Sequence, residues 1–466
     1  MYAWIGMRAP ALVLAALCAA APAADGELDA SFGVNGLRRA GTTDTYSEIP
    51  TAMALQPDGK IIYCGGEGEF ANIDFFVVRF TADGDLDTSF SFDGKTTIDF
   101  DGRTDICHGV AVQADGKIVV AGTTFPFPDP NADFAVARLN ADGTLDTTTF
   151  GAGTGKSVVG FDLGGTNDDN GNSVALRPDG RIVVGGSATT ATDGLDFAVL
   201  QLNADGSRDT SFNLTGRATI GFNLAGGTKN EAANQVAVDS QGRIVLAGLA
   251  DAGAPGGTDF AAARLLPNGQ PDPDFSADGR VVIAFDLGGA AAGNGDGAYT
   301  MLLQRDDRIV LGGFADSSPT STANQDMAVV RLLPDGSLDS SFGIGGRTTI
   351  AFDLEPDGPD LVLAMAEQSN GRLVLGGAAQ RPATNIILAA AVRLLPNGLP
   401  DPGFGTLGKK TYDFGLTTVP GQLFGGVAMQ NNKIVFTGVL YVTDLGNVDA
   451  YAARVLNDLI FAAGFE

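Results

Sequence analysis

A turn that joins two apolar runs recurs seven times along this chain of 466 residues, at intervals of about sixty residues. Self-similarity at such a period means that one supersecondary module is copied along the chain. The copies extend from Leu28 to Leu456, so we expect one repeat domain instead of several unrelated ones. The seven turn segments are Ala54–Gly66, Ala111–Gly122, Ala175–Gly186, Ala237–Gly248, Leu302–Gly313, Ala366–Gly377 and Ala428–Gly438.

Each module carries four segments with the character of β-strands. Segment a precedes the turn, as in Gln235–Val238, and segment b follows it, as in Arg243–Gly248, which predicts a hairpin. Segment d, as in Arg217–Phe222, follows a second glycine turn and the element L-D-x-S-F-x-x-x-G. Segment c is the motif D-F-x-V-x-R-L or a weaker version of it, at Asp74–Phe80, Asp133–Leu139, Asp196–Leu202, Asp259–Leu265, Asp326–Leu332, Leu388–Leu394 and Asp449–Val455.

Four short antiparallel strands, repeated seven times, predict an all-β fold: a seven-bladed β-propeller of four-stranded antiparallel blades. The chain ends support this prediction. Leu28–Arg39 supplies a segment d with no earlier segments, and Gly426–Leu456 supplies segments a, b and c with no segment d after them. We therefore expect the N-terminal strand to pair with the C-terminal blade and to close the ring, which hides the strand edges.

The first residues do not fit the repeat. Arg8 precedes an apolar run, and Ala21-Pro22-Ala23 forms a small-x-small cleavage site, so residues 1–23 are expected to be a secretory signal peptide. Residues 24–457 then form the propeller and 458–466 a C-terminal tail. We expect an exported protein, periplasmic or extracellular, because no later segment is apolar for long enough to cross a bilayer.

The chain is strongly acidic, with a formal net charge of -26. This charge argues against nucleic acid as a partner and against insertion into anionic membranes, and it favours solubility. Cys64 and Cys107 remain once the signal peptide is removed. Both are placed at the same end of neighbouring modules, so either a disulfide between modules or two buried free thiols is expected.

The elements D-G-K/R-I-V-x-x-G and L-D-x-S-F-G-x-x-G resemble the delta-60 repeat, a family of exported bacterial β-propeller proteins. The resemblance covers essentially all of the mature chain. It implies a secreted propeller and brings no catalytic residues. Individual modules depart from the pattern, with Asp307 in place of the turn glycine, Gln201 in place of the segment-c arginine, and one extra residue in Leu145–Phe150.

Two charged residues recur in the modules and are interpreted as scaffold, because active sites are usually singular whereas every blade turn needs the same cap. The aspartates of L-D-x-S-F are expected to accept hydrogen bonds from turn amides or from the segment-c arginines. The aspartates are Asp29, Asp87, Asp146, Asp209, Asp272, Asp339 and Asp401. The arginines are Arg79, Arg138, Arg264, Arg331, Arg393 and Arg454.

No catalytic constellation stands out, and we expect no cofactor. His108 is the single histidine, which argues against a histidine-based triad or a metal centre built from imidazoles. Chemistry by two carboxylates stays open, because 55 acidic residues cannot be sorted by sequence. Calcium also stays open in the acidic loops Asp162–Asp169, Gly293–Gly297 and Asp353–Asp360, with solvated turns as the alternative.

The connections between segments b and c differ in length and composition in every module, whereas the other hairpin turns are short and nearly uniform. These connections share one rim with the d–a connections, and function often lies on such loops when a rigid scaffold holds them. Tolerated drift is the alternative. The aromatic residues expected to stack on a ligand are Phe125, Phe127, Phe314 and Tyr441.

The sequence therefore predicts a secreted, non-enzymatic propeller that binds a surface protein or a polysaccharide through this rim. The first alternative is an extracellular polysaccharide hydrolase or lyase that uses rim carboxylates. The second is an inert structural protein of the surface or matrix.

Overall fold

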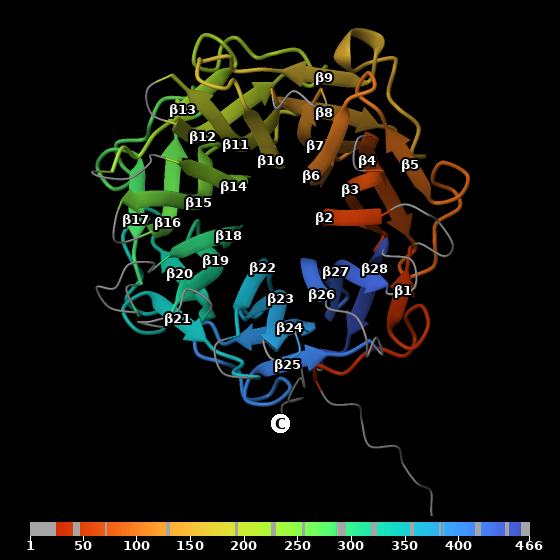
Figure 1. The fold of residues 1–466 in the computed structure, drawn as a ribbon, viewed down its shortest axis with the longest axis vertical. Helices are drawn as coiled ribbons and strands as arrows, with labels where there is room; N and C mark the ends of the chain where they lie inside the picture. Colours follow the sequence, from red (N-terminus) through yellow and green to blue (C-terminus); the bar gives the residue numbers. More distant parts are fainter. Residues whose placement is uncertain are drawn as a thin grey trace, which may run out of the picture.

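The computed structural model describes residues 25–457, except for 41–46, 70–71, 127–130, 192–193, 225–229, 254–256, 286, 288–294, 318–323, 355–357, 382–383, 385, 415–420 and 443–446. The expected signal peptide and C-terminal tail lie outside the described residues. Seven four-stranded antiparallel sheets surround a central axis, so the predicted seven-bladed propeller is confirmed (Figure 1).

The strands follow one another in chain order, four to a blade. Blade 1 contains β2 (Ser47–Leu55), β3 (Ile61–Glu69), β4 (Asn72–Phe80) and β5 (Lys95–Ile98). Blade 2 contains β6 (Thr104–Val112), β7 (Ile118–Phe125), β8 (Asp133–Leu139) and β9 (Lys156–Val159), with the 3-10 turn η1 (Gly151–Gly153) before β9. Blade 3 contains β10 (Asp169–Leu176), β11 (Ile182–Thr190), β12 (Gly194–Leu202) and β13 (Arg217–Ile220).

The remaining blades repeat this order. Blade 4 contains β14 (Glu231–Val238), β15 (Ile244–Gly253), β16 (Gly257–Leu265) and β17 (Arg280–Ile283). Blade 5 contains β18 (Asp296–Leu303), β19 (Ile309–Asp316), β20 (Gln325–Leu332) and β21 (Arg347–Ile350). Blade 6 contains β22 (Asp360–Glu367), β23 (Leu373–Arg381), β24 (Ile386–Leu394) and β25 (Lys409–Tyr412). Blade 7 contains β26 (Gln422–Gln430), β27 (Lys433–Val442), β28 (Asn447–Val455) and β1 (Leu37–Arg39).

Blade 7 closes the ring with strands from both ends of the chain. β1 pairs antiparallel with β28, with Leu37 opposite Ala453 and Arg39 opposite Tyr451. The backbone N–H of Asp29 also donates to the carbonyl of Arg454 at 2.8 Å. The predicted pairing of the N-terminal strand with the C-terminal blade is confirmed, and it protects the edge of that blade.

The first strand of each blade lies nearest the axis and the fourth lies at the circumference (Figure 1). The two middle strands are buried on both faces, because each blade packs between two neighbours. In blade 2, Val120 and Ala135 pack against blade 1, whereas Val119 and Val136 pack against blade 3. Burial on both faces explains the nearly continuous apolar runs of segments b and c, where a half-exposed strand would alternate with polar residues.

The inner hairpins are longer than the sequence predicts. Segment a of blade 4 begins at Glu231 and segment b continues to Gly253, several residues beyond the expected limits at both ends. Among the described residues there is no helix of the length and hydropathy needed to span a membrane.

Candidate functional site

Every blade has a β-bulge at the same position of its innermost strand. The pairing with the second strand skips one residue each time, between Cys107 and Gly109 in blade 2 and between Gly171 and Ser173 in blade 3, for example. A bulge leaves one residue outside the ladder and turns its side chain in a new direction. The seven bulged residues are Thr51, His108, Asn172, Asn234, Tyr299, Leu363 and Gly425.

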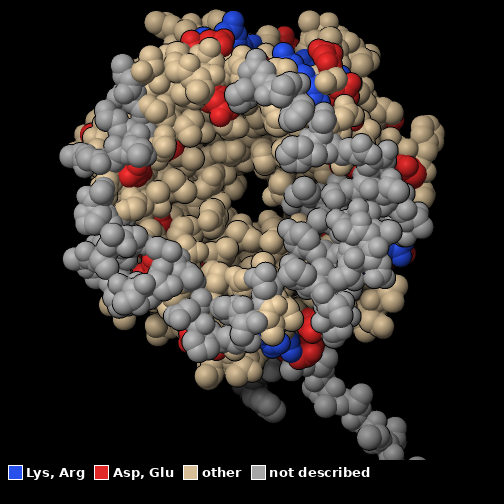
Figure 2. All heavy atoms as spheres, viewed as in Figure 1, with Lys and Arg blue, Asp and Glu red and all other residues tan. Residues whose placement is uncertain are grey.

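These seven residues form a ring around the central channel. Together with the residues that follow them in each strand, they line a cavity of about 610 Å³. The space-filling view shows the channel open at the centre of the ring (Figure 2). Among the described residues that line it, none carries a charged side chain, although the chain as a whole has a formal net charge of -26. The channel is therefore a neutral site in an acidic protein.

The first four bulged residues give the ring a polar side. The Thr51 hydroxyl donates to the carbonyl of Cys107. The Asn172 side-chain amide donates to the carbonyl of Ala233 at 3.0 Å, and that of Asn234 donates to the carbonyl of Ala298 at 2.8 Å. Each acceptor is the residue immediately before the bulge of the next blade. These bonds fix the side chains, and each amide also carries an oxygen that can accept a hydrogen bond.

His108 is the fourth polar member of the ring. Its burial within the propeller lowers its pKa to about 4, so the imidazole is neutral near pH 7. Cys107, its neighbour in the sequence, is bonded to Cys64 and cannot act as a nucleophile with it. The channel histidine can therefore donate or accept one hydrogen bond without bringing a charge into the cavity.

The opposite side of the ring is apolar and contains Tyr299, Leu363 and Gly425. The Tyr299 ring packs against Phe314, with the ring centroids 5.3 Å apart, and burial raises the pKa of its hydroxyl. Met301 and Met365 continue the apolar lining. Hydrogen-bonding groups on one side of the cavity thus face an aromatic and aliphatic surface on the other.

The four aromatic residues expected on loops mostly belong to the strands. Phe125 is the last residue of β7 and is half-buried, and Tyr441 lies within β27, where its side chain is outside the described set. Phe314 lies inside β19 and is 7% exposed, so its expected place in a loop is wrong, whereas its stacking on a ligand stays a prediction. The reason is the longer inner hairpin, which incorporates this residue and packs its ring on Tyr299. Phe127 falls outside the described residues.

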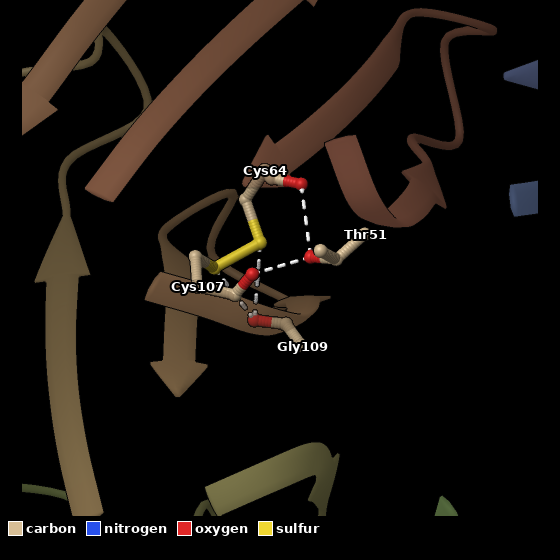
Figure 3. The surroundings of a disulfide bond; sticks show 4 residues. All are labelled: Thr51, Cys64, Cys107 and Gly109. Carbon is tan, nitrogen blue, oxygen red and sulfur yellow. Dashed lines mark hydrogen bonds between the residues drawn. A yellow bond between two sulfur atoms is a disulfide. The ribbon is translucent and has the colours of Figure 1, made fainter. Parts of the chain in front are cut away.

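The two cysteines form a disulfide that connects blade 1 to blade 2 (Figure 3). Cys64 lies within β3 and Cys107 within β6, so both are inside strands and not at strand ends as the sequence suggested. Both sulfur atoms are buried in the apolar layer between the blades. The Thr51 hydroxyl lies beside the disulfide, because its single hydrogen is shared between the carbonyl of Cys107 and that of Cys64, the latter at 3.3 Å.

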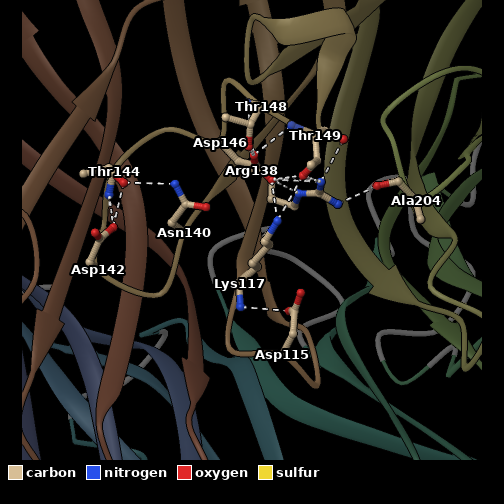
Figure 4. Close-up of polar contacts among 10 residues, drawn as sticks. All are labelled: Asp115, Lys117, Arg138, Asn140, Asp142, Thr144, Asp146, Thr148, Thr149 and Ala204. Atoms are coloured by element: carbon tan, nitrogen blue, oxygen red, sulfur yellow. Dashed lines mark hydrogen bonds and ion pairs between the residues drawn. The ribbon is translucent and has the colours of Figure 1, made fainter.

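The repeated aspartates and arginines form one buried network per blade. In blade 2, Arg138 Nε donates to Asp146 Oδ2 at 3.0 Å, and another guanidinium nitrogen donates to the carbonyl of Ala204 in blade 3 (Figure 4). The guanidinium also lies over the ring of Phe150, 4.7 Å from its centroid. The same arginine–aspartate contact, between 2.6 and 2.8 Å, occurs for Arg79, Arg264, Arg331, Arg393 and Arg454.

Each network contains a second cation that the sequence interpretation missed. It is the basic residue directly after the Asp-Gly turn, such as Lys117, whose ammonium lies 2.8 Å from Asp146 Oδ2. Its recurrence in the turn motif was the available signal. Burial would raise the pKa of Asp87 in blade 1, but hydrogen bonds from Ser89 and Lys60 outweigh it and hold that pKa at about 2. The pKa is lowered likewise for Asp29, Asp146, Asp209, Asp339 and Asp401, so these carboxylates are ionised components of the scaffold.

Blade 3 replaces this network with a different arrangement. Gln201 stands where other blades have the arginine, and its amide donates to Asp209 Oδ2 at 2.8 Å. Arg177 stands where blades 1 and 2 have glutamine, and it donates to Gln201 Oε1 at 3.1 Å. The two residue types have exchanged positions, so the positive charge is retained in the blade.

A third repeated group begins the innermost strands on the rim of the variable loops. Asp360 Oδ2 accepts the backbone N–H of Phe352 at 2.6 Å, and Gln422 makes the same contact with Phe414 at 3.1 Å. Burial raises the pKa of Asp360 to about 7. Equivalent contacts are made by Asp105, Asp169, Glu231 and Asp296. Recurrence and substitution by glutamine indicate a structural turn cap.

Comparison with known proteins supports the repeat architecture. Residues 56–90, 113–148, 177–212, 240–275 and 304–342 match the family model described as "Domain of unknown function (DUF5122) beta-propeller". The chain is thus a β-propeller repeat protein. No curated protein matches the sequence.

Among solved structures, the polysaccharide lyase Uly1 is similar at 11% identity and a TM-score of 0.47, over 90% of this chain and 92% of that one. A protein of unknown function from Dyadobacter fermentans is 11% identical with a TM-score of 0.42, over 91% of this chain and 100% of that one. The GH93 α-L-arabinofuranosidase of Fusarium graminearum is 12% identical with a TM-score of 0.42, over 74% and 92%. Similarity at these levels carries no inference about activity.

Proposed function

We propose that this protein is an exported, non-enzymatic binding propeller that recognises a neutral sugar chain at its central channel. The observation that carries the proposal is the bulge ring. At this one position the seven blades carry six different residue types, while the strands around them keep a repeated pattern. A rigid scaffold that diversifies a single ring of inward-facing residues is suited to recognition.

The chemistry of the channel favours a neutral, amphipathic ligand. Asn172, Asn234 and neutral His108 offer hydrogen-bonding groups on one side, and Tyr299 and Leu363 offer apolar surface on the other. A pyranose has hydroxyl groups at its edge and C–H groups on its faces, so it can use both sides. The cavity volume of about 610 Å³ lies within the range of ligand sites, roughly 300–1,000 Å³. Charged ligands find no opposite charge in the described lining.

Export is supported by the disulfide between Cys64 and Cys107, because structural disulfides form and persist mainly in oxidising compartments. The resemblance to the delta-60 repeat agrees with this location. We propose a periplasmic or extracellular protein that contacts polysaccharide at the cell surface.

The alternative of carboxylate catalysis rests on the raised pKa values of Asp105 and Asp360, to about 6 and about 7. Perturbed carboxylates often mark active sites. Here, however, both accept a backbone N–H within a cap that recurs in other blades. The repeated cap explains them without catalysis, and we therefore favour binding.

The test is a binding screen with neutral oligosaccharides, using the mature chain and a variant that blocks the channel. Leu363→Trp places a large ring in the cavity, and Ile344→Trp places the same ring on a residue that is 88% exposed outside it. We expect a hit whose affinity falls at least about tenfold in Leu363→Trp and is unchanged in Ile344→Trp. Unchanged binding in Leu363→Trp, or binding only to protein partners, would overturn the proposal.

A further inference from the structure

The junction between blades 1 and 2 holds a cluster of carboxylates away from the channel. Asp74 lies in β4, directly before its apolar run, and Asp99 follows β5 in the same blade. Asp105 lies in β6 of the next blade. One carboxylate oxygen from each lies within 4.8 Å of the others. Calcium binds oxygen at about 2.4 Å, so two ligands on opposite sides of one ion are about 4.8 Å apart. The three oxygens are therefore spaced closely enough for small side-chain movements to bring them around a single calcium ion.

The buried side of this cluster has unused hydrogen-bonding capacity. Asp105 is 0% exposed; its Oδ2 accepts the N–H of Phe100 at 2.6 Å, but its Oδ1 has no hydrogen-bond partner. The hydroxyl of Thr124, also 0% exposed, lies beside Asp105 and makes no hydrogen bond of ordinary geometry. Asp74 Oδ1 is buried without a partner as well. The Thr124 hydroxyl is close enough to lower the pKa of Asp105, but the carboxylate oxygens of Asp74 and Asp105 still lack ordinary hydrogen bonds, which is costly in a buried place unless something binds them.

Two members of the group depart from the repeat, and they do so at the same junction. Asp99 occupies the position held by Gly160 in blade 2 and Gly221 in blade 3. Thr124 pairs with Asp105 across the sheet, where blades 3 and 4 pair Asp169 with Ala188 and Glu231 with Ala250. The carboxylate of Asp105 belongs to the common turn cap. Asp99 and the Thr124 hydroxyl are additions to it.

The charge of the cluster is only partly compensated. Lys156 donates from its ammonium to the backbone carbonyl of Asp99 and lies close enough to Asp74 to lower its pKa. Burial nevertheless raises the pKa of Asp74, and it raises that of Asp105 to about 6. At the next junction, by contrast, Arg103 forms an ion pair with Asp133 at 3.2 Å.

We propose that Asp74, Asp99, Asp105 and Thr124 form a calcium site that joins blade 1 to blade 2. Three carboxylates and a hydroxyl are hard oxygen ligands, and the exposed position of Asp99 leaves one side open for the water molecules that complete the coordination of calcium. Asp99 Oδ1 already accepts the N–H of Gly102 at 2.6 Å, which holds this carboxylate in place. The site lies on the same junction as the Cys64–Cys107 disulfide.

The test uses the full mature chain, stripped with a chelator and titrated with calcium by calorimetry. We expect one calcium ion per chain, and a rise in the thermal midpoint on adding calcium. Asp99→Gly should weaken binding by at least about tenfold, and Thr124→Ala by a smaller factor. Both replacements restore residues that other blades carry at these positions, so both variants should unfold at the wild-type midpoint in chelator.

A matched control is available in blade 6. Asp413 occupies the position of Asp99, but Leu388 and Gln422 stand where blade 1 and blade 2 provide Asp74 and Asp105. Asp413→Gly should therefore leave calcium affinity unchanged. No heat or thermal shift at millimolar calcium would overturn the proposal, as would equal losses in Asp99→Gly and Asp413→Gly. Magnesium binding as tight as calcium binding would overturn the choice of ion, because magnesium retains its waters more strongly.

Discussion

The exchange of arginine and glutamine between two positions in blade 3 predicts a rescue experiment in blade 5. Blade 5 has Gln304 directly after its first strand and Arg331 on its third, the reverse of Arg177 and Gln201. Arg331→Gln alone should destabilise the protein. The second change, Gln304→Arg, should restore much of the loss by reproducing the arrangement of blade 3.

The magnitude follows from the contacts that Arg331 makes. Its guanidinium donates to Asp339 at 2.8 Å and to the carbonyl of Pro396 in blade 6 at 2.7 Å, and it lies 4.6 Å from the centroid of Phe342. Loss of a buried ion pair costs about 3–5 kcal/mol when the partner is left alone. Asp339 keeps Arg308 at 3.3 Å and the hydroxyl of Ser341, so we expect about 3 kcal/mol.

The double variant should recover about half of this free energy. The guanidinium introduced at position 304 would reach the amide introduced at position 331, as Arg177 reaches Gln201 in blade 3. It would also face Glu367, which now accepts a hydrogen bond from Gln304 at 2.7 Å. The contact with Pro396 would not return, so complete recovery is not expected.

The assay is thermal and urea unfolding of the wild type, both single variants and the double variant. For a domain of this size, 3 kcal/mol corresponds to a shift in midpoint of about 3 °C. A single Arg331→Gln variant within about 0.5 kcal/mol of the wild type would refute the importance of the network. Additive losses in the double variant would refute the interpretation of blade 3 as a compensated exchange.

Three other predictions follow from separate parts of the molecule. Replacing Cys64 and Cys107 together by alanine should lower the free energy of unfolding by about 4 kcal/mol, from the loop entropy for a separation of 43 residues. The wild type unfolded with and without reductant should show a similar difference, and equal stabilities would contradict this prediction. The pKa of Asp360 is raised by burial to about 7, above its unfolded value, so its contribution is complete below about pH 4 and is lost as pH rises through about 7. Asp360→Asn keeps a side-chain oxygen that can accept the same backbone N–H, as Gln422 does in blade 7. The thermal midpoint of this variant should fall less than that of the wild type between pH 5 and pH 8. Parallel plots of midpoint against pH for the two proteins would contradict the raised pKa of Asp360. Because the pKa of His108 is about 4, sugar binding at the channel should be independent of pH from about 6 to 8; a titration in that range would show that the imidazole carries charge.

The scaffold was predictable because its determinants are local and repeated. The Asp-Gly turns and the D-F-x-V-x-R-L motif mark strands within single blades, and the complementary half-modules at Leu28–Arg39 and Gly426–Leu456 indicate how the ring closes. Strand ends were predicted less well, since the hairpins continue beyond the glycines that appeared to end them. Phe314 was misplaced for that reason.

The candidate sites could not be predicted in the same way. The bulge at His108 is a shift of register in the pairing of β6 with β7, and no residue type in the strand predicts its position. The carboxylates of Asp74, Asp99 and Asp105 belong to two blades and come together only when those blades pack. The repeated sequence pattern predicts features that all blades share, whereas both proposed sites include positions at which the blades differ.

The sequence by itself therefore determined the number and order of the blades, because a periodic pattern of turns and apolar runs specifies hairpins one at a time, and it indicated the closure of the ring through the complementary incomplete modules at its ends. The tertiary structure decided which side chains face the channel, that Cys64 meets Cys107, and which acidic residues converge at the junction of blades 1 and 2. These features depend on register and on packing between strands far apart in the chain, where local propensity has no influence.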